Sequence, residues 1–230
     1  MKSLRNAAFA GIAVIAMSAA LSSQALAEGH GGYSWSGLYV GGQVGYGFGD
    51  TSHSFSNLAP GGDSSPDGFL GGVHIGYMMP MDQVVLGVEA DIEATGMDGT
   101  YQNPTAGTSS GSTDINWQGS VRAKVGYDMG QYLPYVTAGV AFADVDYGGG
   151  PLGGPCCGYS STAVGWTAGA GMNVAITDAI FGGFEYRYTD FGTESGGLAP
   201  TFPAVIMPVD LQTHTFRVSL SVKLESLFGQ

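Results

Sequence analysis

The sequence has 230 residues, of which 19 are acidic and seven are basic, so its formal net charge at neutral pH is −12. This acidity argues against nucleic acid as a partner, because nucleic-acid binding needs a basic surface. Glycine accounts for 40 residues and only 11% of residues are charged, a composition that would suggest disorder if aromatic residues and alternating apolar runs were absent. Both are present, so we expect disorder only in loops.

The N-terminal 27 residues have the build of a secretory signal peptide. Two basic residues precede an apolar run over residues 7–20, and an A-x-A cleavage site follows at residues 25–27. The run is too short to cross a bilayer, and no later stretch approaches the roughly 18 apolar residues that a membrane helix needs. We predict a signal peptide over residues 1–27 and one domain over residues 28–230, in which five basic and 19 acidic residues give a net charge of −14.

Eight segments of the predicted domain alternate between apolar residues and polar or small residues, which is the pattern of β-strands with one apolar face. The first half of the chain contains four of them, at residues 38–48, 69–77, 84–93 and 115–127. A long loop at 49–68, a short turn at 79–82 and a long loop at about 97–111 separate them. In the fourth segment Trp117, Val121 and Tyr127 share the apolar parity. Arg122 and Lys124 share the polar parity.

The second half of the chain repeats this arrangement. Its four segments are residues 135–142, 164–174, 180–188 and 213–224. Short turns at 128–131 and 177–178 alternate with long loops at about 146–160 and 191–210. Connections therefore alternate between short and long along the whole chain, which indicates a meander of antiparallel strands with its short turns on one side.

An outer-membrane barrel accounts for these features together. The number of segments is even, and each has about ten residues, enough for a tilted strand to cross the hydrocarbon core. Aromatic residues of the apolar parity gather near the segment ends, where a membrane barrel places its aromatic girdles: Phe48, Phe69, Tyr77, Trp117, Tyr127, Phe142, Trp166, Tyr188 and Phe216. We predict an all-β fold, an eight-stranded antiparallel transmembrane up-and-down β-barrel with short periplasmic turns and four long extracellular loops. A soluble lipocalin-like barrel would instead turn its polar parity outward.

The charged residues of the segments share the parity that would face the lumen. This predicted lumen charge network consists of Glu89, Asp91, Glu93, Arg122, Lys124, Glu185, Arg187, Arg217 and Lys223. A basic residue on the lipid face at the bilayer midplane would cost roughly 2–4 kcal/mol, which explains why none occurs there. We expect the three acidic residues of the third segment to lie opposite Arg122 and Lys124. Barrel closure then brings Arg187 and Arg217 towards the same interior.

Two interpretations of this network compete. In one, salt-bridged polar side chains fill the lumen in place of a hydrophobic core. In the other, the same groups line an ion-selective pore. An eight-stranded barrel is only just wide enough for its own side chains, which favours the filled lumen. Inner glycines such as Gly41, Gly139 and Gly169 leave room for water and favour the pore.

Candidate chemical sites are sparse, and we expect no enzymatic activity, cofactor or metal site. His74 has the inner parity, and we expect it to bond to the lumen carboxylates. His214 has the outer parity, but a lipid hydrolase would need a serine beside it, and Ser219 and Ser221 have the opposite parity. His53, in the first predicted loop, is a weak candidate for binding haem or a metal.

Two adjacent cysteines, Cys156 and Cys157, lie in the third predicted long loop. In an oxidising compartment they can form a vicinal disulfide, remain reduced or pair between chains. A bridge between neighbours closes almost no loop, so it would add little stability. They can also bind a soft metal ion, and nothing in the sequence favours that alternative.

Three motifs resemble a known family. Residues 35–46, WSGLYVGGQVGY, resemble the W-x-G-x-Y-x-G-x-x-x-G-Y start of the small outer-membrane β-barrel proteins of alphaproteobacteria, called porin-family or outer-membrane immunogenic proteins. Residues 71–77, GGVHIGY, and 182–188, GGFEYRY, resemble the second and penultimate strands of that family. The resemblance extends over residues 33–224. It departs at the C-terminus, where the usual terminal aromatic of the last strand is replaced by Phe228, a shifted candidate for the assembly signal.

The resemblance implies a location in the outer membrane of a Gram-negative bacterium and a structural role. Envelope integrity and contact with host or environmental surfaces would be its function. Outer-membrane lipid, lipopolysaccharide and the barrel-assembly machinery would be its partners. Two other functions stay open: a narrow porin-like channel for small solutes or ions, and capture of a surface ligand such as haemin.

Overall fold

The computed structural model of the protein describes residues 33–53, 62–102, 110–150, 157–197 and 206–224. The predicted signal peptide, Cys156 and Phe228 lie outside these residues. Within the described ranges, no helix is long and apolar enough to cross a membrane.

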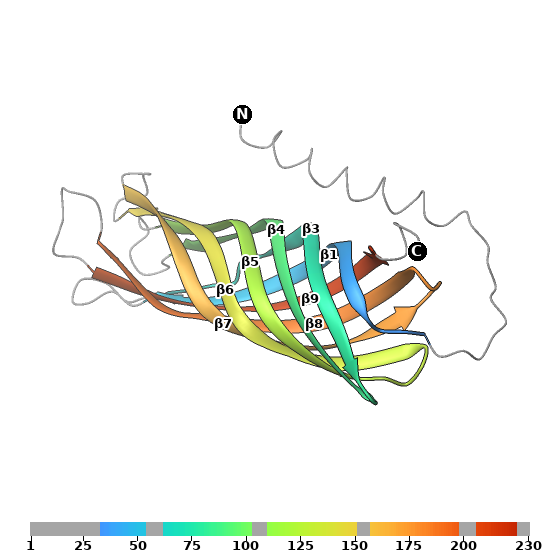
Figure 1. The fold of residues 1–230 in the computed structure, drawn as a ribbon. Helices are drawn as coiled ribbons and strands as arrows, with labels where there is room; N and C mark the ends of the chain where they lie inside the picture. Colours follow the sequence, from blue (N-terminus) through green and yellow to red (C-terminus); the bar gives the residue numbers. More distant parts are fainter. Residues whose placement is uncertain (1–32, 54–61, 103–109, 151–156, 198–205, 225–230) are drawn as a thin grey trace.

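The described chain forms one antiparallel sheet that closes on itself (Figure 1). Eight long strands build the wall, and β2 is a three-residue strand beside the loop end of β1. The strands are β1 (Gly37–His53), β2 (Gly62–Ser64), β3 (Asp67–Met81), β4 (Val84–Gln102), β5 (Ser110–Tyr127), β6 (Tyr132–Gly150), β7 (Cys157–Ala175), β8 (Ile180–Gly197) and β9 (Ile206–Lys223). Each long strand pairs with its neighbours in sequence, and β1 pairs with β9 from Tyr39↔Lys223 to His53↔Val209. The predicted closed, eight-stranded meander is confirmed.

The strands are longer than predicted. The long ones contain 15–19 residues, whereas about 9–11 suffice to cross the hydrocarbon core. The excess lies at the loop end: β4 reaches Gln102 and β5 begins at Ser110, within the predicted loop 97–111. The predicted first loop likewise contains the end of β1, all of β2 and the start of β3. Glycine, serine, aspartate and proline indicated a loop at residues 49–68, but cross-strand pairing keeps parts of both loop regions extended.

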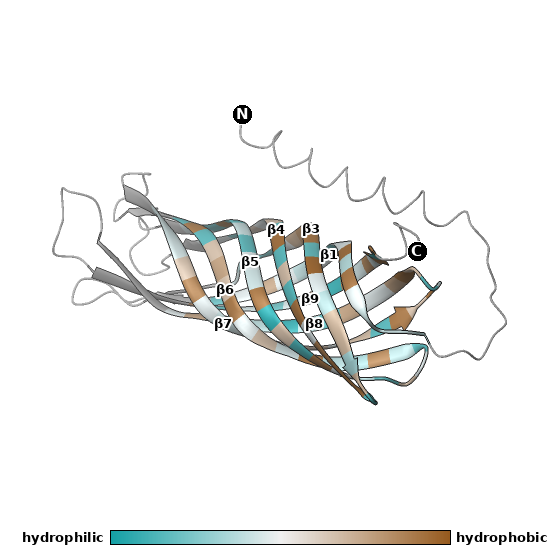
Figure 2. Cartoon of the chain, in the orientation of Figure 1, coloured by the Kyte–Doolittle hydropathy of each residue, from teal (hydrophilic) through white to brown (hydrophobic). Residues whose placement is uncertain are grey.

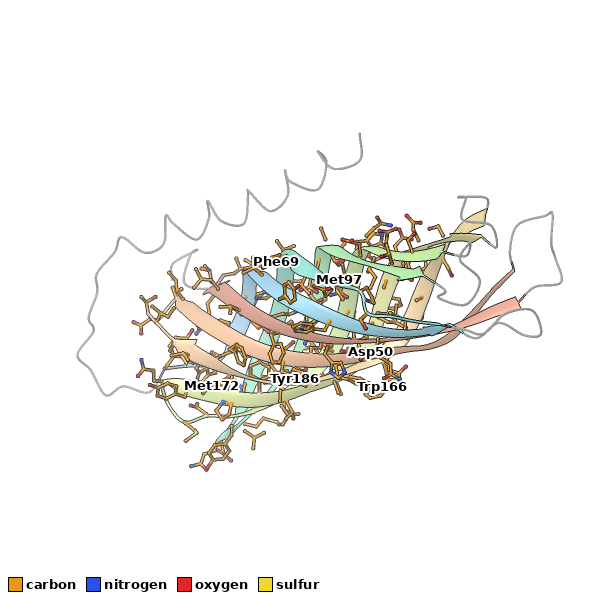
Figure 3. All side chains as sticks on the ribbon, turned by 180° about the vertical axis from the view of Figure 1, so that it is seen from behind. Asp50, Phe69, Met97, Trp166, Met172 and Tyr186 are labelled. Carbon is orange, nitrogen blue, oxygen red and sulfur yellow. The ribbon has the colours of Figure 1, made fainter. Side chains whose placement is uncertain are left out.

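The outer face of the barrel is apolar, as predicted for contact with lipid. Large apolar side chains that point outward along the strands are exposed, and apolar and polar bands alternate along each ribbon (Figure 2). Phe69 of β3, 78% exposed, and Trp166 and Met172 of β7 are examples, labelled in Figure 3. Near the loop end the aromatic rings contact one another across strands. Tyr46 lies 4.9 Å from Phe69, between ring centroids.

The inner face contains two apolar clusters, one at each end of the lumen. The cluster at the end with the short turns, here the turn-end cluster, consists of Trp35, Tyr39, Met78, Val85, Leu133, Ala175 and Phe181. The loop-end cluster consists of Met97, Ile115, Ala141, Ala143, Val145, Ala163, Phe191 and Leu211. The charged residues of the lumen other than Lys223 lie between these clusters.

Candidate functional site: the barrel lumen

Five strands bring the charged side chains of the lumen together. β4 supplies Glu89, Asp91 and Glu93, β5 supplies Arg122 and Lys124, β8 supplies Glu185 and Arg187, and β9 supplies Arg217 and Lys223; β3 adds His74. All are buried, because successive residues of a strand alternate between the lipid face and the lumen. The register places Glu89 directly opposite Arg122, and Glu185 directly opposite Arg217.

Arg122 is the centre of the network. Its guanidinium contacts three carboxylates: Glu89, Asp91 at 3.1 Å and Glu185 at 2.7 Å. The residue is only 1% exposed. A guanidinium has five donors in a fixed plane, so it can bind several carboxylates at once, which an ammonium on a flexible stem does less well. One side chain of β5 thereby links β4 to β8 across the lumen.

Three further cations complete the network. The Lys124 ammonium lies 2.6 Å from Glu89. Arg187 binds Asp91 at 3.1 Å and Glu185 at 2.8 Å. Arg217 binds Glu93 at 2.8 Å. The expectation that Glu93 lies opposite Arg122 and Lys124 is therefore corrected: its cross-strand neighbour is Gln118, and its charge partner comes from β9.

The charges within this layer balance. Four carboxylates face four cations, and neutral side chains donate further hydrogen bonds to carboxylate oxygens that already bind a cation. The Tyr39 hydroxyl donates to Glu89 at 2.6 Å and the Ser120 hydroxyl donates to Asp91 at 2.6 Å. The amides of Gln43 and Gln118 donate to Glu93 at 2.7 and 2.8 Å. Because each buried charge is paired and hydrogen-bonded, the layer avoids the free-energy cost of burying an unpaired charge.

Lys223 belongs to the turn end rather than to this layer. Its ammonium donates to the Ser34 carbonyl oxygen at 2.6 Å and lies 5.0 Å from the centre of the Tyr33 ring. Tyr33 precedes β1, outside the membrane-spanning strands. Burial, helped by the negative charge of Asp178, raises the pKa of its phenol above the usual range, so the ring stays neutral beneath the cation.

His74 bonds to a hydroxyl rather than to a carboxylate. Its Nε2 atom lies 2.8 Å from Ser221 Oγ, so the prediction that it bonds to the lumen carboxylates is wrong. Gly41, opposite His74 on β1, makes this position possible, because a Cβ there would lie 2.5 Å from Nε2. The cavity beside His74 measures about 10 Å³, room for about one water molecule.

Of the other histidines, His214 is the one whose side chain lies among the described residues. His214 faces outward, and its Nδ1 atom lies 2.7 Å from the Tyr186 hydroxyl. Ser221, which the sequence placed on the opposite parity, is buried inside and bonds to His74. His53 is the last residue of β1, and Cys157 is the first of β7. The predictions that concern a haem ligand and a vicinal disulfide stay predictions.

Sequence reasoning missed the turn-end cluster. Trp35 lies before β1, is fully buried, and donates its indole N–H to the Gly130 carbonyl oxygen at 3.0 Å. Its ring packs edge-on against Phe181, with centroids 5.6 Å apart. The signal was present in the parity: Val85 and Leu133 each follow a short turn and have the inner parity, yet both are apolar. An inner face that is apolar at its ends indicates a lumen that is sealed there.

Comparisons with known proteins agree with this geometry. The family described as the outer membrane protein beta-barrel domain matches residues 13–223. The 25 kDa outer-membrane immunogenic protein of Brucella melitensis is 35% identical over 191 residues, which cover 83% of this chain and 80% of that protein. The 22 kDa outer membrane protein of Rhizobium leguminosarum bv. viciae is 38% identical over 160 residues, 69% of this chain and 65% of that protein.

Among solved structures, the outer membrane protein OprG from Pseudomonas aeruginosa aligns with a TM-score of 0.47 and 12% identity, covering 82% of this chain and 96% of that one. The family match spans most of the sequence, and the two relatives are named for the outer membrane. The closed barrel and its apolar outer face are what such a location requires. The chain therefore belongs to the outer membrane protein beta-barrel domain family and is an outer-membrane protein of the alphaproteobacterial type.

Proposed function

We propose that this protein is a structural, non-catalytic surface protein that supports envelope integrity and displays its loop end for contact with host or environmental surfaces. The observation that carries this proposal is the filled lumen. Arg122 binds three carboxylates from two strands across the barrel, and an apolar cluster lies on either side of this layer of charges. A pore would need a continuous wet path through these three layers.

The arrangement of polar groups supports a structural role for the charges. Four cations are matched by four carboxylates at 3.1 Å or less, so each charge is already held by a protein partner. The cavity at His74 accommodates about one water molecule, far less than a hydrated ion with its shell. The same groups in a conducting pore would have to exchange partners each time an ion passed.

Outer-membrane lipid, lipopolysaccharide and the barrel-assembly machinery are the partners that this role requires. The exposed apolar band with aromatic rings towards both ends supports contact with lipid. Strands that continue past the length needed to cross the bilayer support a role outside it, since they raise the loop end above the membrane surface.

Single-channel recording tests the closed lumen. Purified protein inserted into planar bilayers should show no steady conductance, and the Arg122→Met variant, if it inserts, should show more frequent openings. A large, steady conductance of the unaltered protein would establish the narrow channel instead.

A genetic test addresses envelope integrity. Deleting the gene from its own bacterium should increase sensitivity to detergent, and a plasmid copy should restore resistance. A matched copy that carries Val121→Leu, a change on the lipid face, should restore it equally well. Unchanged detergent sensitivity after deletion would remove the integrity role and leave surface contact alone.

A further inference from the structure

The wall between β7 and β8 is paired along only part of its length. β7 pairs with β6 from Tyr132↔Val174 to Gly149↔Cys157, but with β8 only from Ala175↔Phe181 to Trp166↔Asp190. β8 continues beside β9 as far as Gly197↔Ile206. Among the described residues, therefore, no cross-strand pair joins residues 157–165 of β7 to residues 191–197 of β8, although Gly165 still lies beside the backbone of Asp190 and Phe191. We call this gap the β7–β8 seam.

A local change in β8 opens the seam. The register with β9 shifts between Asp190 and Thr193, and Gly192, within that shift, has a φ of 66°. A residue with a side chain adopts this left-handed conformation at a cost, which glycine avoids. The Asp190 carboxylate accepts a hydrogen bond from the Gly192 backbone N–H at 2.8 Å and holds the bend. In Figure 1 the loop ends of β7 and β8 diverge beyond this point.

The seam begins where the membrane ends. The last cross-strand pair is Trp166↔Asp190, and Trp166 lies against Tyr188 on the outer face, with centroids 5.3 Å apart. Aromatic rings of this kind mark the membrane interface. Unpaired backbone groups are too costly within hydrocarbon, so the wall has to be fully paired below this level. Above it, water can reach the free backbone groups of both strands.

Residues 157–165 of β7 lack the sequence features by which proteins protect exposed strand edges. Natural edges are shortened, or carry lysine, proline or inward-pointing charges, because a bare edge pairs with other chains. Residues 157–165 read CGYSSTAVG, which contains neither proline nor any charged residue. The strand is nine residues long along this edge, enough for an added strand of ordinary length.

We propose that the β7–β8 seam is a docking site for an extended, cationic polypeptide segment, which adds as a strand to the free edge of β7. The proposal rests on the surface-contact part of the proposed function and names the class of partner. Addition of a strand to an exposed edge gains main-chain hydrogen bonds, while alternate side chains of the added strand provide specificity.

The surroundings of the edge define those alternate side chains. Inward positions of the added strand would lie over Ala163 and Phe191 of the loop-end cluster, so they should be small or apolar. Outward positions would lie near Asp190 of β8, and Asp144, the β6 partner of Thr162, lies one strand further away on the same outer face. All described lysines and arginines lie inside the barrel, so no fixed cation on the outer wall offsets these aspartates. Basic side chains fit the outward positions.

Fluorescence anisotropy with designed peptides tests the proposal. The probe is a labelled eight-residue peptide of alternating lysine and valine, titrated with the full-length mature protein in nanodiscs. Saturable binding at one peptide per barrel is expected, and a glutamate–valine peptide should not bind. No saturable binding of the lysine–valine probe would overturn the proposal.

Backbone methylation separates strand addition from simple charge attraction. Two versions of the probe carry N-methyl groups on alternate amides, one version for each parity. At least one should bind about tenfold more weakly or worse, because several main-chain hydrogen bonds are lost while the charge is unchanged. Equal binding of both methylated versions and the parent would show charge attraction alone and overturn strand addition.

Two measurements on the protein locate the site. Hydrogen exchange should slow at amides of residues 157–165 on binding, and protection confined to other strands would contradict the seam. Asp190→Asn, which keeps the Oδ1 acceptor for Gly192, should weaken binding several-fold, whereas Asp82→Asn in a short turn should not.

Dimers that form without peptide and protect the same amides would identify a second copy of this chain as the occupant and overturn the cationic partner. Because conductance is recorded separately, a closed barrel that binds no peptide would refute the seam and leave the structural role intact.

Discussion

The charged layer and the turn-end cluster fill the same lumen by opposite means. In the charged layer, Arg122 serves three carboxylates at once, so each partner depends on the others. In the turn-end cluster, Trp35 and Phe181 contribute apolar area that does not depend on a particular partner. We infer that the layer of charges specifies how the strands are arranged, since a misplaced strand leaves a buried charge unpaired, whereas the apolar ends add stability in graded amounts.

Removing the centre of the charged layer should have the largest effect. Arg122→Met leaves Glu89, Asp91 and Glu185 without their shared partner, and removal of one member of a buried ion pair costs about 3–5 kcal/mol. Urea unfolding in lipid vesicles, followed by the shift between folded and unfolded bands on unheated gels, measures the loss. Val121→Leu, one residue away on the lipid face, should stay within about 0.5 kcal/mol. A loss below about 1 kcal/mol for Arg122→Met would mean that the layer tolerates a missing member.

The turn-end cluster should respond in proportion to the atoms removed. Trp35→Ala deletes a fully buried ring, and such deletions cost about 3 kcal/mol or more. Trp35→Phe keeps most of the packing but loses the hydrogen bond to Gly130 and part of the ring, so a smaller cost of roughly 1–2 kcal/mol is expected. The same unfolding assay compares the two variants. Equal losses would show that the hydrogen bond, rather than the packing, stabilises this end.

Two adjacent glycines test how tightly the charged layer is packed. In Gly41→Ala the new methyl group would lie 2.5 Å from both His74 Nε2 and the Leu220 carbonyl oxygen, and overpacking of this kind costs about 1–3 kcal/mol. Gly42 faces lipid, where the nearest atom to an added Cβ is 3.9 Å away. Gly42→Ala should therefore change the unfolding free energy little. Similar results for both variants would indicate a lumen with spare room.

The smallest effect is expected at the hydroxyl beside His74. Ser221→Ala removes the partner of His74 Nε2 and should cost about 1 kcal/mol, because a buried polar atom loses its hydrogen bond. The cavity of about 10 Å³ lies next to both residues, so a water molecule can replace part of what is lost. A larger loss than that of Gly41→Ala, in the same unfolding assay, would show that this contact is a main support of the layer.

Strand parity predicted the faces of the barrel, because a period of two assigns every residue of a strand to one side. Trp117 outside and Arg122 inside follow from that period alone. Parity also places Arg217 in the lumen. It does not predict that Arg217 binds Glu93, since that choice depends on how far each strand is staggered around the barrel. Partners 124 residues apart leave no local signal in the sequence.

Two other features could not be predicted from the sequence, because they depend on which strands lie side by side. The loop-end extensions of β4 and β5 are rich in glycine, serine and threonine, so their composition resembles that of a loop. They form strands because neighbouring strands pair with them. The β7–β8 seam is the reverse case: residues 157–165 form a strand with β6, and only the bend at Gly192 removes its second neighbour. Local sequence indicates the conformation of a segment, but it does not indicate which other segment lies beside it.

The position of Trp35 gives the protein an internal optical reporter. The chain has three tryptophans; Trp117 and Trp166 face lipid, whereas Trp35 lies in a dry cluster built from β1, β3, β4, β6, β7 and β8. Those surroundings assemble only when strands from both halves of the chain have come together. In a protein whose Trp117 and Trp166 are changed to phenylalanine, the emission of Trp35 would follow closure of the barrel, and in a Trp35→Phe protein the emission of Trp117 and Trp166 would follow insertion into the bilayer.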